Sequence, residues 1–249
     1  MWSGPRNLST AMMRSFSARA DCAVWDEPFF AAYLAETGLD HPMRADILAA
    51  HDTDAARVAA RCGGPAPRGA PLFYQKHMTH HMLPQFDRTF MDKVTSAFLI
   101  RDPHLVAASY EVKRDEPTLD DLGVPQQWAL FEQVAQRLGK APPVVDSADI
   151  AANPQRTLNA LCDALGIPFD EAMLSWPQGL HPDDGVWAKH WYHAVIKSTG
   201  FAPPRAATPL MTDHAKRIAE AAWPVYEALR AHALTTPRDA SQKEMTDGP

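Results

Sequence analysis

The start of the chain carries the feature that most constrains its fold, a turn that runs directly into an amphipathic helix. Gly4 and Pro5 are turn residues, and the short polar side chains of Asn7, Ser9 and Thr10 follow where the helix begins. The first turn of a helix leaves backbone N–H groups unpaired and carries the positive end of the helix dipole. An anion placed there is bound by donors that need a partner.

Arg6 adds a full positive charge to this loop, and an apolar face follows on which the helix can be buried: Ala11, Met12, Met13, Phe16 and Ala18. The spacing is not that of the Walker nucleotide loop, in which two glycines are followed by Lys and then Ser or Thr. The stretch therefore predicts an anion-binding loop that opens a helix. The alternative is an ordinary capped helix at the surface.

Composition limits the class of protein. A chain of 249 residues with 46% hydrophobic content can bury a large core. We expect one α/β domain over residues 1–235, with a helical cover or insertion at about 31–70 and a flexible tail at 236–249. The formal net charge of -6 argues against nucleic acid or an anionic membrane as a partner, so anion recognition must depend on locally placed cations.

The cysteines indicate neither a disulfide framework nor a metal site. Cys22, Cys62 and Cys162 are scattered and lack metal-ligand spacing, which is typical of buried thiols in a reduced compartment. The sequence shows no basic and apolar leader and no long apolar run. We therefore expect a soluble, cytoplasmic protein without a bound metal or a membrane span.

Apolar runs alternate with helical patterns along the chain. Strands are expected at 21–26, 71–75, 94–100 and 143–146, and helices at 126–138 and at 157–165, the latter closed by Gly166. This alternation predicts a parallel β-sheet flanked by helices. Only Met1 to Ser3 precede the anion-binding loop, so its strand is either shortened to a stub or begins before the given sequence.

Polar side chains follow three of these strands, at the edge where open α/β sheets bind their ligands. They are Asp26 and Glu27 after the first, Lys76, His77, His80 and His81 after the second, and Arg101, with Ser109 two helical turns later, after the third. The histidine cluster is typical of proton transfer, since no acidic pattern of a metal motif accompanies it. For Arg101, a salt bridge to Asp102 or Glu111 is the alternative to anion binding.

Three blocks of sequence, in order, resemble the sulfotransferases that use 3′-phosphoadenosine 5′-phosphosulfate. They are the loop at Pro5-Arg6, the stretch from Arg101-Asp102-Pro103 to Ser109-Tyr110, and residues 149–174, where Asn153-Pro154 and Gly166-Ile167-Pro168 stand. The similarity spans roughly residues 2 to 200. It is greatest to uncharacterised bacterial sulfotransferase-like proteins whose loop reads Trp-Ser-Gly-Pro-Arg-Asn.

This resemblance implies a sulfotransferase fold like that of P-loop NTPases, and transfer of a sulfuryl group to a hydroxyl or amine of a small-molecule acceptor. The residues implied in binding the sulfate-bearing end are Arg6, Asn7, Leu8, Ser9 and Thr10. Arg101 and Ser109 are implied in binding the 3′-phosphate. No metal is required, because cations of the chain neutralise the phosphosulfate.

The chain departs from the family pattern at the base and at the 3′ loop. Cytosolic members have Lys-Thr-His after a strand, whereas bacterial carbohydrate-type members resemble this chain at Glu27-Pro28-Phe29, where glutamate is the proposed base. Glu27, His77 and His80 are thus the candidates, with Arg6 stabilising the transferred group. Glu27 is favoured because Lys76 disfavours the imidazolium that His77 must become.

The glycine-rich Arg-Lys-Gly loop of the family is absent. Residues 184–192 stand in its region, and they either cover the nucleotide with aromatic rings and Lys189 or form an aromatic packing segment. A small-molecule kinase with a divergent phosphate loop and a non-catalytic nucleotide-binding module remain alternatives. A helical interaction protein would leave the polar clusters at the strand ends unexplained.

Overall fold

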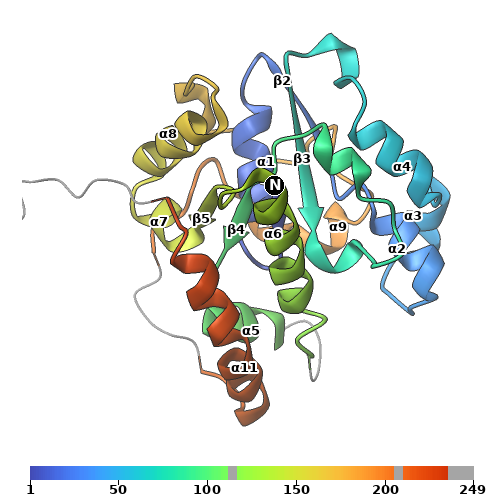
Figure 1. The fold of residues 1–249 in the computed structure, drawn as a ribbon, viewed down its shortest axis with the longest axis vertical. Helices are drawn as coiled ribbons and strands as arrows, with labels where there is room; N and C mark the ends of the chain where they lie inside the picture. The colour runs from blue at the N-terminus through green and yellow to red at the C-terminus, as the bar shows by residue number, and fades with distance from the viewer. Residues whose placement is uncertain (112–116, 205–209, 235–249) are drawn as a thin grey trace, which may run out of the picture.

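The computed structural model describes residues 1–111, 117–204 and 210–234. Its centre is a five-stranded sheet in the order β2-β3-β1-β4-β5. The strands are β1 (Trp2–Ser3), β2 (Cys22–Asp26), β3 (Leu72–Met78), β4 (Phe98–Ile100) and β5 (Val144–Asp146). All four neighbouring pairs are parallel, and helices flank the sheet (Figure 1). The expected α/β class is confirmed.

Seven of the described α-helices form three groups around the sheet (Figure 1). On the side of β2 and β3 lie α2 (Phe30–Thr37), α3 (Arg44–Ala50) and α4 (Ala55–Cys62), while α7 (Ser147–Ala152) and α8 (Pro154–Leu165) lie beyond β5. Past the carboxyl ends of the strands, α5 (Pro103–Glu111) contacts α11 (Asp213–Arg230). The remaining α-helices are α1 (Ser9–Ser17), α6 (Val124–Leu138), α9 (Ala188–Trp191) and α10 (His193–Ile196), and 3₁₀ turns occupy Pro67–Gly69, Thr79–His81, Thr89–Asp92 and Glu171–Leu174.

The shortest strand is the middle one. β1 has two residues, and Trp2 pairs with His77 of β3 on one side and with Phe98 of β4 on the other. The turn that follows β1 therefore opens at the centre of the sheet's carboxyl edge. From there α1 begins at Ser9, as the sequence predicts for a loop that opens a helix.

Two predicted strands have the wrong limits. β3 continues to Met78, so Lys76 and His77 lie within the strand and not after it. The strand expected at 94–100 is wrong over 94–97, because β4 begins at Phe98. The reason is that the partners of β4 are short: β1 has two residues and β5 three, and the ladder can extend only as far as they do.

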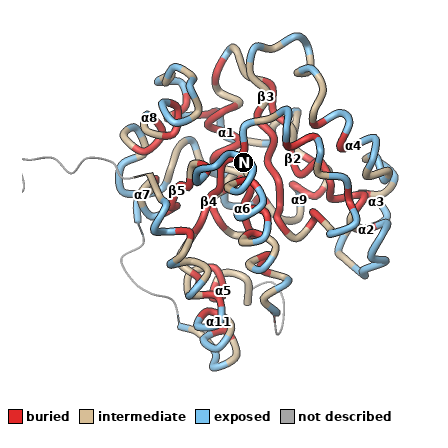
Figure 2. Tube along the Cα trace, viewed as in Figure 1, coloured by how far each residue is buried: buried red, intermediate tan, exposed pale blue. Residues whose placement is uncertain are grey.

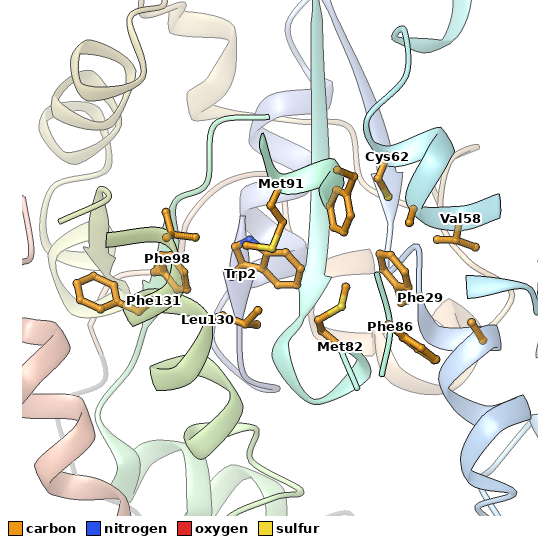
Figure 3. Packing of buried hydrophobic residues seen from close by; sticks show 14 of the residues in the cluster. Trp2, Phe29, Val58, Cys62, Met82, Phe86, Met91, Phe98, Leu130 and Phe131 are labelled. Carbon is orange, nitrogen blue, oxygen red and sulfur yellow. The ribbon is translucent and has the colours of Figure 1, made fainter. Parts of the chain in front are cut away.

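Side chains that alternate along the strands bury two apolar clusters, one on each face. Trp2, Phe98, Ile100 and Val144 belong to the first cluster, which Phe131 of α6 and Val58 of α4 complete. Figure 3 shows the Trp2 indole in the middle of it, with Met91 above and Leu130 below. The second cluster contains Leu99 and Val145 of the strands with residues of α1 and α8. Buried residues accordingly follow the strands through the centre of the molecule (Figure 2).

Residues 175–200 form a segment that we call the strap, which includes α9 and α10. A bridge between Ser175 and Gly200 joins its two ends, and the Gly179 amide donates to the Ile196 carbonyl oxygen. Trp187 of the strap is buried against Phe30 of α2 and Ile47 of α3. The strap is therefore fixed to the helices beside β2.

The other boundary predictions have mixed outcomes. Gly166 ends α8 with a φ of 69°, as expected. The predicted start at residue 157 is wrong, because Asn153 caps the helix by accepting from the Arg156 amide and the helix begins at Pro154. The region at about 31–70 contains three helices, but its role as a cover stays a prediction, as does the domain limit at residue 235. The tail predicted at 236–249 lies outside the described residues. In the described ranges, no helix has the length and apolar character needed to cross a membrane.

Candidate functional site

A crevice is expected where β1 and β4 lie side by side. The chain leaves β1 toward β2 on one side of the sheet, and it leaves β4 toward β5 on the other. The two loops diverge, and open α/β sheets bind ligands at such a switch point. A small cavity of about 30 Å³ lies here, lined by Asn7 of the first loop and Arg101 of the second.

The first loop, residues 4–8, has an unusual backbone. Arg6 and Leu8 have positive φ values of 63° and 62°, a region that side chains other than glycine seldom adopt. Such alternation turns successive N–H groups toward one point and makes a concave anion site. Strain of this kind persists where the surroundings enforce it, often at functional sites.

The start of α1 does not fit the alternative of an ordinary capped helix. Leu8 is the N-cap, and no side chain caps the helix, although short polar residues surround the position. The first-turn N–H groups at Ser9, Thr10 and Ala11 have no partner within the helix by the geometry of an α-helix. They are therefore available to an anion in front of the helix.

Neighbouring contacts hold the loop tightly. A Cβ atom added to Gly4 would lie 2.4 Å from the Leu122 carbonyl oxygen, so only glycine fits there. The Asn7 side chain donates to the Leu99 carbonyl oxygen at 3.4 Å. The Ser3 Oγ and the Asn7 Oδ1 are buried and have no hydrogen-bond partner within the described part of the chain. The Ser3 hydroxyl can donate to an anionic ligand, whereas the Asn7 Oδ1 can only accept from an N–H or O–H group of a ligand.

Three residues that the resemblance implicated in phosphate binding meet at the crevice. Arg6 Nε donates to the Ser109 hydroxyl at 2.9 Å, and Arg101 Nη1 donates to the Arg6 carbonyl oxygen at 2.5 Å. All three residues are half-buried. Arg101 thus reaches the loop that follows β1, and two guanidinium groups stand close to one helix N-terminus.

A second polar group, which we call the acidic corner, lies at the ends of β2 and β3. It consists of Asp26, Glu27, Lys76 and Tyr192. Lys76 Nζ lies 2.9 Å from Asp26 Oδ1, 2.5 Å from Glu27 Oε1 and 2.5 Å from the Tyr192 hydroxyl. The Tyr192 hydroxyl in turn lies 2.8 Å from Asp26 Oδ2 and 3.1 Å from Glu27 Oε1.

Burial dominates the electrostatics of the acidic corner. It raises the pKa of Glu27, against the lowering effect of the Lys76 ammonium. For Lys76, burial lowers the pKa, but the Asp26 and Glu27 carboxylates outweigh it and the net pKa is raised. The pKa of Tyr192 is raised well above its ordinary value by burial and by the same two carboxylates. Glu27 also has a positive φ of 41°, so its backbone is strained.

The structure separates the three histidines at the carboxyl end of β3, of which His77 lies within the strand and His80 and His81 follow it. His77 points to the opposite face from Lys76, because side chains alternate along β3. It stacks on Trp2 with ring centroids 4.3 Å apart, its Nε2 lies 3.1 Å from Gln75 Oε1, and burial lowers its pKa well below 6.5. This placement favours packing over proton transfer.

The other two histidines lie near Glu27. His81 Nδ1 is 3.8 Å from Glu27 Oε2, and its ring stacks on Phe30 at 4.4 Å. His80 is half-buried and packs edge-on against Tyr33. Burial lowers the pKa of His81 well below 6.5, so that it stays neutral near pH 7. The sequence placed His81 in the histidine cluster but did not single it out with Glu27, His77 and His80 as a candidate base.

Lys189 is exposed on α9. The residues on either side of α9 are bound to the end of β2: the Gly185 amide donates to Asp26 Oδ2 at 3.1 Å, and the Tyr192 hydroxyl contacts the same carboxylate. The structure therefore joins the segment that contains α9 to the acidic corner, with the Lys189 side chain exposed. Its nucleotide contact stays a prediction.

In the described ranges, no set of three His, Cys, Asp or Glu side chains is arranged to hold a metal ion.

Two features of the acidic corner were missed from the sequence, namely Tyr192 and the pairing of Lys76 with carboxylates. Asp26 and Lys76 are partners in the parallel register of β2 and β3, which correct strand limits would have revealed.

The chain belongs to the sulfotransferase domain family, whose family model matches residues 1–233. The resemblance inferred from the sequence is confirmed. Two curated relatives, the branched-chain-amino-acid aminotransferase-like proteins 1 and 2 of Arabidopsis thaliana, are each 34% identical over 93% of this chain. The chain spans 41% of the length of each, so their names describe much longer proteins.

Two solved structures are similar to the chain. One is the sulfotransferase domain from the Synechococcus PCC 7002 olefin synthase, with 19% identity, a TM-score of 0.47, and coverage of 88% of this chain and 92% of that domain. The other is the sulfotransferase domain from the curacin biosynthetic pathway, with 16% identity, a TM-score of 0.45, and coverage of 88% and 95%.

Proposed function

We propose that the protein transfers a sulfuryl group from 3′-phosphoadenosine 5′-phosphosulfate to a hydroxyl or amine of a small-molecule acceptor. The observation that carries this proposal is the meeting of Arg6, Arg101 and Ser109 at the crevice between β1 and β4. Two arginines and a serine from two segments meet in front of a helix N-terminus, which suits a nucleotide with phosphate on its 3′ and 5′ oxygens.

Each group at the crevice has a role in this proposal. The N–H groups of residues 6–10 and the Arg6 guanidinium hold the sulfate-bearing end, and Arg101 with Ser109 holds the 3′-phosphate. The nucleotide supplies a sulfuryl group with a good leaving oxygen. Fixed donors around that group stabilise the charge that develops as the bond to the leaving oxygen breaks. Holding the acceptor in line supplies the rest of the acceleration.

Glu27 is the base that the geometry supports best. Its Oε1 is held by Lys76 at 2.5 Å, whereas the only described contact of its Oε2 is His81 at 3.8 Å. Oε2 can thus take the proton of the acceptor hydroxyl or amine while that atom forms its bond to sulfur. His77 is directed into the core, and His80 stands beside Tyr33 at the acceptor side. We further propose a cytoplasmic location and no metal requirement.

The experiment that tests the proposal measures transfer. The protein is incubated with 3′-phosphoadenosine 5′-phosphosulfate and a panel of phenols, alcohols and amines, and sulfated products are detected by mass spectrometry. Sulfation of at least one acceptor, lost in Arg6→Ala and retained in the exposed control Arg68→Ala, is the expected result. The proposal would be wrong if the protein bound ATP with Mg²⁺ in place of the bisphosphate nucleotide and transferred a phosphoryl group. The protein would then be a kinase.

A further inference from the structure

The acidic corner has more acid than base. Asp26 and Lys76 are each 1–2% exposed and Glu27 is 9% exposed, so the three charges are buried together. Two carboxylates face one ammonium, and the Tyr192 hydroxyl is neutral. Ionising every group would leave one negative charge unbalanced in the interior, which is costly unless a proton or a cation compensates it.

Among the described groups around the corner, neither His51 nor His81 nor Arg14 supplies this compensation. Burial lowers the pKa of His51 and of His81, so both rings are neutral near pH 7. Arg14 is paired with Asp184 at 2.6 Å and leaves no net charge. Three further imidazoles lie near the corner, those of His41 and His80, packed on Phe30 and Tyr33, and that of His77 on the other face of β3. Lys189 of α9 is exposed to solvent.

The hydrogen bonds show where the compensating proton belongs. Asp26 receives three donors: Lys76 Nζ, the Gly185 amide and the Tyr192 hydroxyl. Tyr192 has one proton to give, and its oxygen accepts from Trp187 Nε1 at 2.9 Å and from Lys76. Asp26 is thus fully satisfied as a carboxylate. Among the described contacts, Glu27 Oε2 has only His81 Nδ1 near it, at 3.8 Å, and it can carry a proton.

We propose that Asp26 and Tyr192 are positioning residues that keep a proton on Glu27 Oε2 in the resting protein. The inference depends on the proposed function for its catalytic meaning. Glu27 must first release this proton to solvent, and its carboxylate then takes the proton of the acceptor. The negative charge of Asp26 strengthens the hold of Glu27 on the proton, and the Tyr192 hydroxyl weakens it by donating to Asp26.

The first test is a spectroscopic one that needs no acceptor. Infrared difference spectra of the unaltered protein across a pH titration should show a protonated carboxyl band near pH 7 that is absent in Glu27→Gln. The band should disappear at lower pH in Asp26→Asn, since the repelling charge is gone. Absence of a Glu27-dependent band in the unaltered protein at pH 7 would overturn the proposal, whether or not the variants fold.

The second test is the acid limb of the pH–rate profile for any acceptor found. Asp26→Asn should move that limb to lower pH and Tyr192→Phe to higher pH, each by roughly one unit. Asp183→Asn on the surface of the strap is the matched control and should leave it in place. A purely structural role would lower the rate in both variants without moving the limb, which would contradict the proposal.

If the infrared band is present and no acceptor is sulfated, the proposed function fails while the proton placement stands. If sulfation occurs without the band, the proton placement fails while the proposed function stands.

Discussion

The crevice and the acidic corner lie at the same edge of the sheet and are built in opposite ways. At the crevice, half-buried Arg6 and Arg101 and the N-terminus of α1 combine positive charge that stays in contact with solvent. At the corner, two carboxylates share one lysine, all of them buried. Cations in contact with solvent can bind an anion from solution. A buried excess of carboxylates instead favours binding of a proton.

This difference explains how one edge can serve two chemical needs. β1 separates β3 from β4, so the corner and the crevice are about one or two strand spacings apart, on the order of 5–10 Å. A ligand of nucleotide size bound at the crevice can reach the corner. We therefore expect nucleotide affinity to depend on the crevice and proton transfer on the corner, and variants in each region should separate the two properties.

The largest effect should come from the corner. Glu27→Gln removes the proposed base, and turnover should fall by ~10²–10⁴-fold, the usual contribution of a general base. Nucleotide affinity, measured by calorimetric titration with 3′-phosphoadenosine 5′-phosphate, should stay within about threefold of the unaltered protein. His77→Ala and His80→Ala are the comparison variants. If either variant loses turnover while Glu27→Gln retains it, the base is a histidine. The assignment of proton transfer to the Glu27 carboxylate of the acidic corner then fails.

The next effect concerns the backbone of the crevice. Gly4→Ala places a Cβ against the Leu122 backbone carbonyl, which cannot rotate away, so about 1–3 kcal/mol of stability should be lost. Thermal unfolding should show this as a lower Tm, and titration should show weaker nucleotide binding. Gly64→Ala, whose added Cβ would meet its nearest atom at 3.3 Å, is the control. Equal Tm values for the two variants would show that the loop is less confined than the structure indicates.

Sequence reasoning found the crevice far better than the corner. Arg6, Arg101 and Ser109 follow local signals, since each stands at a strand end or on the helix that follows it, and parallel strands bring those ends together. Tyr192 lies 166 residues from Asp26, and only the path of the strap unites them. Lys76 was placed after β3 because the strand was ended too early. Local patterns carry no information on such distant partners.

The pH dependence of stability gives a smaller effect. The pKa of Glu27 is raised above its ordinary value of 4.5, so its protonated form stabilises the fold below that pH, and the contribution is lost as pH rises through the folded-state pKa. The Gln side chain of Glu27→Gln does not ionise, so this variant loses no stability as the pH rises. The Tm of Glu27→Gln should therefore exceed that of the unaltered protein by a few degrees at about pH 8, and the gap should narrow toward about pH 5. A gap that widens toward acid would mean that Glu27 is stabilised as a carboxylate.

The smallest effect is expected at Lys189. Its side chain is exposed on α9, which belongs to the strap and not to the loop that follows β1. Exposed charge contacts contribute little, about 0–1 kcal/mol. Lys189→Ala should therefore weaken binding of 3′-phosphoadenosine 5′-phosphate by less than about fivefold in calorimetric titration. A larger loss would extend the nucleotide site from the crevice to the strap.

The most direct test of the account is whether the crevice recognises a 3′-phosphate. Calorimetric titrations compare 3′-phosphoadenosine 5′-phosphate with adenosine 5′-phosphate, which lacks that group, on the unaltered protein and on Arg101→Ala. A hydrogen bond to a charged group contributes ~1.5–3 kcal/mol, so the unaltered protein should bind the bisphosphate at least about tenfold more tightly. In Arg101→Ala this ratio should fall toward one, with the affinity for adenosine 5′-phosphate nearly unchanged. The same ratio in both proteins would contradict the assignment of Arg101 and, with it, the division of the edge into two regions.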